Sequence, residues 1–252
     1  MKILFSEAPA DYSRYVFPYA VYALQETETE IPQIYARGFL PYTDTRFPLP
    51  EAPFYYLARS IRVDLKDFSL TSENRRIRRK MEALNPRMQS YERSQFPAGD
   101  DFWAFCRRYA RERIGDAMPA GRLDYIFGHR LLNRIFAFEN GAETLGYVWA
   151  VDRGEMLHYW FAFYNTDYMR HGLGKWMMEQ VISQAAAEGK RYVYLGTCYG
   201  SKAMYKVRDF RAVQYFDGNR WNPVDAHFKA KCKENYSDTL DDWKRFPERY
   251  LL

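Results

Sequence analysis

The sequence predicts an α+β fold in which helices flank a central mixed β-sheet, preceded by a smaller N-terminal region. Three apolar segments in the C-terminal half, separated by short turns, have the length and composition of consecutive strands: 131–139, 144–151 and 156–164. A helical pattern over 170–188 follows, and then a short strand at 192–195. A helix between two neighbouring strands indicates a parallel pair, so the sheet is expected to be mixed.

The other elements are expected from local patterns. Residues 1–57 are rich in Pro, Tyr and turn residues, which favours short strands and loops. Further expected elements are a strand at 56–63, a basic helix that begins near Ser72 and stops at Pro86, a linker at 87–99, a helix over 100–115, helical turns at 201–207 and a strand at 211–216. We therefore expect an N-terminal region over 1–90 and the main domain over 91–252.

Composition excludes several classes of protein. The three cysteines are far apart and form no CxxC pair, which argues against a Cys-rich metal site or a disulfide framework and suits a reducing cytoplasm. No apolar stretch approaches 18 residues, so we expect no membrane span. The formal charge of +5 permits a nucleic-acid partner without requiring one.

A glycine-containing turn precedes the helix at 170–188. Gly172 and Gly174 allow close approach of a ligand to the backbone, and the helix start is an anion site, with Arg170 and Lys175 beside it. Such a pattern also arises from simple packing.

A second segment carries the first resemblance. Ala203-Met-Tyr205 and Phe210, after the strand YVYLG, resemble the A-x-x-x-Y-x-x-x-G-F helix of the GNAT acyltransferases. The resemblance implies that Tyr205 protonates the leaving group, which a phenol can do; the alternative is that Tyr205 packs under the sheet. Met169 stands where that family usually has Gln or Arg, which argues against ordinary acetyl-CoA binding.

A narrower resemblance covers roughly residues 30–222. The chain is similar to the leucyl/arginyl-tRNA–protein transferases, which have a GNAT-like fold. The strings that carry the similarity are Arg37-Gly-Phe39, Arg62-Val63 with Phe68, Ser72-Glu-Asn-Arg75-Arg76, Tyr194-Leu195-Gly196 with Lys202, Tyr205-Lys206 with Phe210, and Asp217-Gly-Asn-Arg-Trp221. It implies transfer of Arg or Leu from aminoacyl-tRNA, the co-substrate, to the N-terminal amine of a protein or peptide, without a cofactor.

Two departures from that family are visible. Many members carry cysteines for a metal or cluster around the segment at 45–53, where this chain has none. Thr197-Cys-Tyr-Gly200 also replaces a loop in which relatives often have Trp or Tyr-Ile. We therefore expect no metal site, and the changed loop is expected to bear on donor or acceptor choice.

The expected chemistry assigns roles to the remaining candidates. The backbone N–H groups of Leu195 and Gly196 would stabilise an oxyanion, and Glu155 and His158 are candidates for taking the amine proton. A neutral α-amine, with a pKa of about 7.7–8.0, needs only modest help to attack the ester. The donor-binding set is Arg170, Gly172, Gly174, Lys175, Leu195, Gly196, Lys202 and Lys206.

A basic cluster is expected to bind tRNA phosphates. Five cations fall within six residues, namely Arg75, Arg76, Arg78, Arg79 and Lys80. Phosphate binding releases counterions, so this contact should weaken with salt; the alternative is a solvated helix face.

Two other functions stay open. One is a GNAT enzyme that uses acetyl-CoA or another acyl-CoA, and the other is a non-catalytic relative that binds tRNA or peptide. The acyl-transfer hypothesis expects the helix start near Gly172 and the phenol of Tyr205 to flank a common cleft.

Overall fold

The protein consists of two compact units. The computed structural model describes residues 1–7, 19–43, 53–115, 118–141 and 143–233. The first unit comprises 1–42, 48–62 and 196–252, and the second comprises 43–47 and 63–195. The division expected at residue 90 falls inside strand β6 (Arg87–Glu92), which is hydrogen-bonded to β7 (Arg134–Glu139), and the units do not separate there.

The larger sheet confirms the expected mixed architecture. Over the described residues its strand order is β12-β11-β5-β10-β9-β8-β7-β6. The pairs from β6 to β9 are antiparallel, and the β9–β10 pair is parallel. Besides β6 and β7, its strands are β5 (Ser60–Asp64), β8 (Thr144–Arg153), β9 (Met156–Tyr164), β10 (Tyr192–Thr197), β11 (Val213–Phe216) and β12 (Trp221–Pro223).

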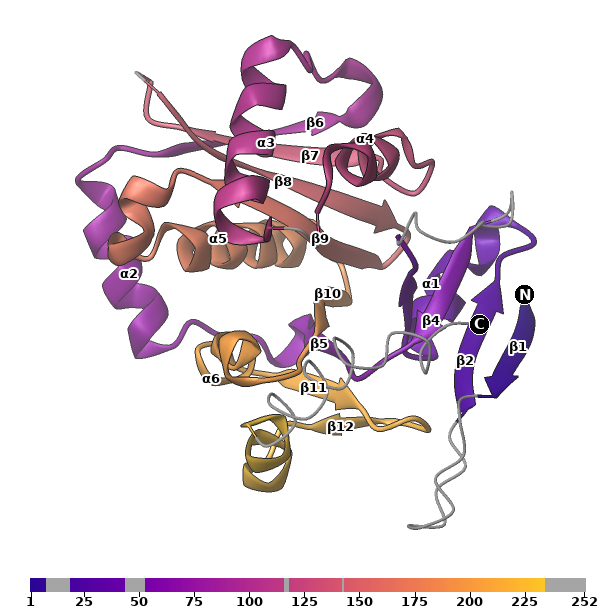
Figure 1. The fold of residues 1–252 in the computed structure, drawn as a ribbon. Helices are drawn as coiled ribbons and strands as arrows, with labels where there is room; N and C mark the ends of the chain where they lie inside the picture. The colour runs from indigo at the N-terminus through magenta and orange to yellow at the C-terminus, as the bar shows by residue number, and fades with distance from the viewer. Residues whose placement is uncertain (8–18, 44–52, 116–117, 142, 234–252) are drawn as a thin grey trace. The chain divides into compact units, whose positions relative to one another are not determined.

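Helices cover both faces of the sheet in the second unit (Figure 1). On one face, α3 (Asp100–Arg113) and α4 (Ala120–Gly128) pack an apolar cluster against Trp149 and Phe163, which are fully buried. On the other face, Trp176 of α5 (Leu173–Ala187) contacts Phe138 of β7, with ring centroids 5.6 Å apart. The alternation of side chains along each strand divides the aromatic residues between these two layers.

Two elements differ from the sequence expectation. The segment expected to be a linker forms β6, whose exposed and half-buried residues lack a strong apolar alternation. The other is α4, which begins after Pro119 and has no counterpart among the expected elements; residues 116–117 before it lie outside the described part. Pairing with β7 and packing on Trp149 provide the stabilisation that local propensity does not indicate.

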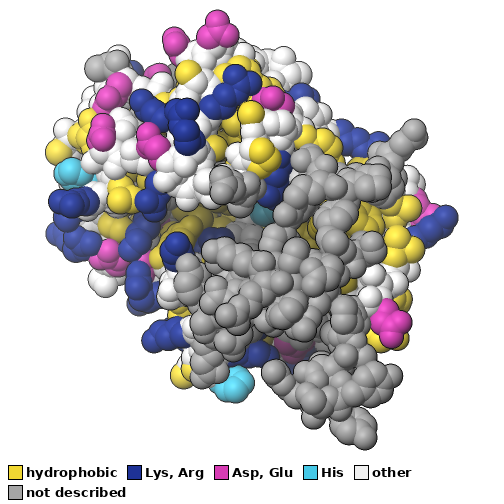
Figure 2. Space-filling model, viewed as in Figure 1, with side chains coloured by type: hydrophobic (Ala, Val, Ile, Leu, Met, Phe, Trp, Pro, Cys, Tyr) yellow, Lys and Arg dark blue, Asp and Glu magenta, His cyan; other side chains and the backbone are white. Residues whose placement is uncertain are grey.

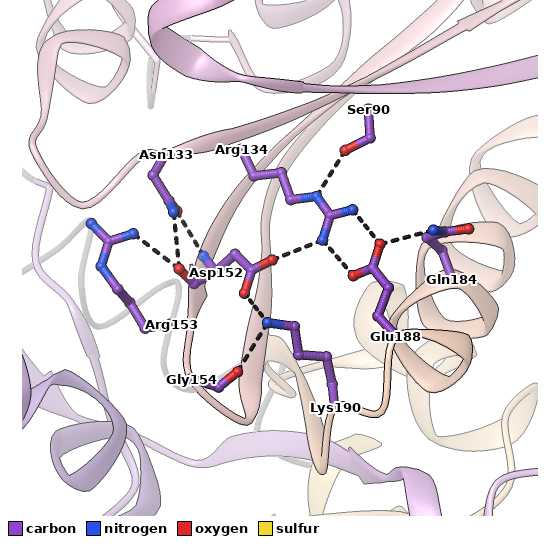
Figure 3. A network of polar contacts seen from close by, with 9 residues as sticks. All are labelled: Ser90, Asn133, Arg134, Asp152, Arg153, Gly154, Gln184, Glu188 and Lys190. Carbon is purple, nitrogen blue, oxygen red and sulfur yellow. Dashed lines mark hydrogen bonds and ion pairs between the residues drawn. The ribbon is translucent and has the colours of Figure 1, made fainter.

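A polar network fastens the end of α5 to the sheet (Figure 3). The Arg134 guanidinium of β7 forms ion pairs with Asp152 of β8 and Glu188, which follows α5. Lys190 pairs with the same Asp152 and donates to the carbonyl oxygen of Gly154. Hydrogen bonds from Arg134 hold the pKa of Glu188 below its usual value. The network joins residues that are far apart in the sequence around one guanidinium.

The first unit is built from distant parts of the chain. A small sheet of order β1-β2-β4-β3 contains β1 (Lys2–Glu7), β2 (Tyr19–Leu24), β4 (Phe54–Leu57) and β3 (Phe39–Pro41), and α1 (Ile31–Ala36) precedes β3. The Trp221 indole donates to the carbonyl oxygen of Ala36 at 2.7 Å. The Arg62 guanidinium, only 7% exposed, lies 4.1 Å from the centre of the Trp221 ring and donates to Gln214.

Gly38 fits this cluster only without a side chain. Its φ of +83° is in the left-handed region, and a Cβ there would lie 2.2 Å from the Phe216 ring. The Ser60 hydroxyl donates to its carbonyl oxygen at 2.6 Å. The strings at 37–39 and 217–221 that carry the family resemblance therefore lie beside each other in the first unit, through the contacts of Gly38 with Phe216 and of Ala36 with Trp221.

We predict that Gly38→Ala destabilises the protein more than a strained backbone alone would. Gly189 is the matched control, because its φ is +74° and a Cβ would meet nothing within 4 Å. Gly189→Ala should cost about 1 kcal/mol of unfolding free energy, and Gly38→Ala should cost about 1–3 kcal/mol more because Phe216 must move. Urea unfolding measures both, and equal losses would contradict the packing argument.

Candidate active site

The parallel pairing of β9 and β10 ends partway along both strands. Three residue pairs are in register, and the last is His158 opposite Tyr194. Beyond it β9 continues to Tyr164 and β10 to Thr197. His158 is buried, at 3% exposure, directly at this point. The strands therefore separate beside His158, where a carbonyl group could reach backbone N–H donors.

A β-bulge lies on β9 at the same place. Ala150 of β8 pairs with Tyr159 and Trp149 pairs with Phe161, so Trp160 is an extra residue without a partner in the β8 register. A bulge re-aims backbone and side-chain groups, and bulges are common beside active sites. The segment HYWFAF contains no glycine or other sequence signal for a bulge, which explains why sequence reasoning did not identify this feature.

The structure separates the two candidates for the proton acceptor. Glu155 is exposed in the turn before β9, where its carbonyl oxygen accepts hydrogen bonds from the N–H groups of Arg191 and Tyr192. Three residues of extended chain, about 10 Å, separate it from His158. Only His158 lies where the strands part.

The glycines at the start of α5 satisfy requirements inside the protein. Gly172 caps α5 with a φ of +89°, and a Cβ there would lie 3.4 Å from Ile77. A Cβ on Gly174 would lie 2.8 Å from the Tyr164 ring. Backbone geometry and packing thus explain both glycines without a CoA ligand. Arg170 is exposed and Lys175 is half-buried beside them.

The other half of the predicted site lies in the first unit. Lys202 is exposed in the 3-10 turn η6 (Ser201–Ala203), and the half-buried Tyr205 is the first residue of α6 (Tyr205–Arg208). Lys206 donates from Nζ to the carbonyl oxygen of Thr197 at 3.2 Å. A Cβ on Gly196 would lie 3.7 Å from that nitrogen. Lys206 is therefore held against the end of β10.

Burial changes the charge state of groups around Lys206. It lowers the pKa of Lys206 to about 8, and the Cys198 thiol opposes part of this shift. It also raises the pKa of the Cys198 thiol to about 12, so that the thiol stays protonated at neutral pH. Lys206 therefore loses its proton at a lower pH than an exposed lysine does.

In the basic helix α2 (Ser72–Glu82), Arg78 contacts a neighbouring helix. Arg78 donates two hydrogen bonds to the carboxylate of Glu179 on α5, at 2.8 and 2.6 Å, and a third to Ser183. Glu179 is 1% exposed. A buried carboxylate needs such a partner, so Arg78 attaches α2 to α5.

The other cations of α2 are exposed, and Figure 2 shows Lys and Arg side chains gathered in the region where Figure 1 places this helix. Arg76 forms a paired contact with Glu73, and Arg75 donates to the carbonyl oxygen of Leu70. Within the described residues, Arg79 and Lys80 have no ion pair. A groove of about 520 Å³ is lined by Leu70, Ser72, Arg75, Arg78, Arg79 and Glu82.

The predicted catalytic groups thus belong to different units. The second unit contains the α2 cations together with Glu155, His158, Arg170, Gly172, Gly174, Lys175 and Leu195. The first unit contains Gly196, Lys202, Tyr205 and Lys206. The placement of the units relative to each other is not determined. The common cleft between Gly172 and Tyr205 therefore stays a prediction.

Two of the other expectations concern absences. The segment at 45–53, where relatives have cysteines, lies outside the described residues except for Pro53. In the described ranges, no helix is both long and apolar enough to cross a membrane, and no three His, Cys, Asp or Glu side chains gather as metal ligands would.

The chain matches a family model described as an acetyltransferase (GNAT) domain over residues 71–207. That range includes α2, the bulge, α5 and Tyr205. The chain also resembles a solved C-terminal domain of a putative lysylphosphatidylglycerol synthetase from Agrobacterium fabrum, at 12% identity and a TM-score of 0.47, over 74% of this chain and 57% of that one.

Curated relatives share more of the sequence. An aspartate/glutamate leucyltransferase of Parvibaculum lavamentivorans is 31% identical over 170 residues, which is 64% of this chain and 68% of the relative. One from Granulibacter bethesdensis is 27% identical over 172 residues, or 65% of this chain. The match spans 62% of the length of the Granulibacter bethesdensis protein, which is less than two thirds.

We predict that Lys206 makes stability rise with pH. Its folded pKa of about 8 is below the ordinary value of 10.5, so between these values the unfolded chain binds more protons and stability increases as pH rises. Lys206→Met removes this dependence and should stabilise the protein at pH 7 by up to about 3 kcal/mol. Urea unfolding at pH 7 and 9.5 measures it, with the exposed Lys202→Met as control. An unchanged pH dependence would contradict the burial of the ammonium.

Proposed function

Because the chain belongs to the GNAT acyltransferases and, within them, to the aspartate/glutamate leucyltransferase family, we propose that it transfers leucine from leucyl-tRNA to the N-terminal amine of a protein. The names of the relatives favour leucine over arginine as the donor amino acid and acidic residues as acceptors. The observation that carries the proposal is the separation of β9 and β10 at a bulge, inside the matched region.

The reaction begins with attack of the neutral α-amine on the ester carbonyl of the aminoacyl-tRNA. A bond forms between the amine nitrogen and the carbonyl carbon, and the oxygen becomes a tetrahedral oxyanion. Backbone N–H groups at the bulge of Trp160 and at Leu195 and Gly196 are the proposed donors to this oxyanion. Holding the two reactants together supplies much of the rate gain.

Two side chains have proposed roles in proton transfer. His158, at the point of strand separation, takes the proton of the attacking amine. Tyr205 then protonates the ribose oxygen as the ester C–O bond breaks. The half-buried position of Tyr205 is compatible with access to substrate. Glu155, three residues earlier in the turn before β9, is less well placed than His158.

The exposed cations of α2 are the proposed contact to the tRNA backbone. Arg75, Arg79 and Lys80 lie on the exposed part of the helix, and Arg75 and Arg79 line its groove. Arg170 and Lys175 are close by at the start of α5, because Gly172 approaches Ile77 of α2. Arg78 lines the same groove and also fixes the helix, because it donates two hydrogen bonds to Glu179.

The alternative is a GNAT enzyme that uses an acyl-CoA donor, which the description of the matched domain favours. A CoA ligand would raise the melting temperature at saturation. No melting shift with CoA, together with leucyl transfer from tRNA, supports the proposal over this alternative.

We predict that purified protein moves labelled leucine from leucyl-tRNA to a peptide with N-terminal Asp or Glu. Tyr205→Phe should lower kcat by roughly 100-fold with little change in KM for the tRNA, since only the proton donor is lost. Tyr19→Phe is the control, because it removes an exposed phenol of β2 in the same unit. No transfer by the wild type would contradict the function, and full activity of Tyr205→Phe would remove Tyr205 from the mechanism.

We also predict that single substitutions separate the two roles of α2. Arg79→Met and Lys80→Met should each make the slope of the logarithm of the tRNA binding constant against the logarithm of salt concentration less steep by about one, without loss of stability. Arg78→Met should instead lower the free energy of unfolding by roughly 2–3 kcal/mol, because Glu179 would stay buried without its partner. Arg107→Met, on the exposed part of α3, is the control for general charge loss. Unchanged salt slopes in the Arg79→Met and Lys80→Met variants would exclude this surface as the contact to tRNA.

A further inference from the structure

Four rings form an aromatic group beside the bulge in the second unit. Trp160 contacts Phe161, with ring centroids 5.5 Å apart, and His129, at 5.8 Å. The His129 ring in turn contacts Tyr125 of α4 at 5.5 Å. All four residues are half-buried, so the group is neither closed core nor fully open surface. We call Tyr125, His129, Trp160 and Phe161 the aromatic wall.

The bulge explains why the wall exists at this point. Trp160 is the extra residue of β9, and it packs with Phe161 against the apolar cluster under α3 and α4. In a regular strand, these consecutive side chains would point to opposite faces of the sheet. The same bulge lies directly beyond the last β9–β10 pair, at His158.

His129 belongs to the wall as a neutral ring. Its Nδ1 accepts a hydrogen bond from the Leu131 N–H at 3.1 Å. Burial, with a smaller contribution from Arg130, lowers the pKa of His129 to about 4, and no carboxylate contributes to this shift. The wall therefore presents carbon and neutral nitrogen at physiological pH, with a cation at its margin. Such a surface suits an apolar group, which needs no hydrogen bond when it is buried.

We propose that Trp160 and Phe161 contact the side chain of the transferred amino acid and make the enzyme select a large apolar aminoacyl donor over a small one. This inference rests on the proposed function, in which the ester carbonyl sits at the bulge. The Cα and side chain of the amino acid are attached to that carbonyl, so they lie next to the bulge residues. An indole wall at that position contacts leucine over its whole length and alanine hardly at all.

The test measures kcat/KM for leucyl-tRNA and alanyl-tRNA with one acidic peptide as acceptor. Trp160→Ala should lower the leucyl-to-alanyl ratio by about 10-fold or more, because a pocket contact of this kind is worth 10- to 200-fold per methylene. Trp160→Phe should recover most of the ratio. Trp103→Ala is the matched control, because its ring contacts Phe127 and Trp149 in the same unit and lies outside the wall.

The outcomes separate this inference from the function itself. A leucyl-to-alanyl ratio that stays at the wild-type value in Trp160→Ala and in Phe161→Ala, with both variants folded and active, would overturn the inference. So would a change in acceptor preference with no change in donor ratio, since the wall would then bind the acceptor. Failure of the wild type to transfer any amino acid would contradict the proposed function instead.

Discussion

The parting of two parallel strands is the constraint on which the candidate site depends. Parallel strands normally satisfy each other's backbone groups along their full length. Here the register of β9 and β10 ends at His158 and Tyr194, and the bulge at Trp160 prevents regular pairing with β8 as well. Regular pairing of β9 is therefore interrupted towards both of its neighbours at nearly the same place. The buried His158 and the rings of Trp160 and Phe161 lie at this interruption.

The position of α2 illustrates how one charged run serves two purposes. Its sequence reads as a uniform basic helix, yet Arg78 turns inward to a buried carboxylate and its neighbours stay exposed. A buried Glu179 without its partner would be costly, so this contact fixes the rotation of α2 about its axis. Arg75, Arg79 and Lys80 are then directed outward by helical geometry.

The sequence allowed the strongly periodic elements to be predicted. The three strands of the meander, α5, α2 and α3 follow apolar patterns that reflect local burial. β6 and α4 could not be foreseen, because their stabilisation comes from partners elsewhere in the chain, β7 and Trp149. Among the site residues, Tyr205 and the glycines were indicated by motif, and Arg78 was taken for a surface cation because nothing in the sequence points to Glu179.

The site contained a second kind of feature that sequence could not reveal. The bulge depends on how β8 and β9 pair, and a shift of one residue leaves no mark in the composition of either strand. Burial of Lys206 is similar, since its pKa reflects the packing of α6 on the end of β10. Such properties belong to tertiary arrangement and require coordinates.

The discontinuous first unit has a consequence for synthesis on the ribosome. Ala36, Gly38 and Arg62 meet Phe216 and Trp221 only after roughly 160 or more further residues have been made, although β2, β3 and β4 can pair earlier. At translation rates of about 5–20 residues per second, these three contacts wait roughly 8–30 s. During that interval the nascent chain exposes surfaces such as Ile61 and Phe39 that are later buried, and it is then a natural client for chaperones.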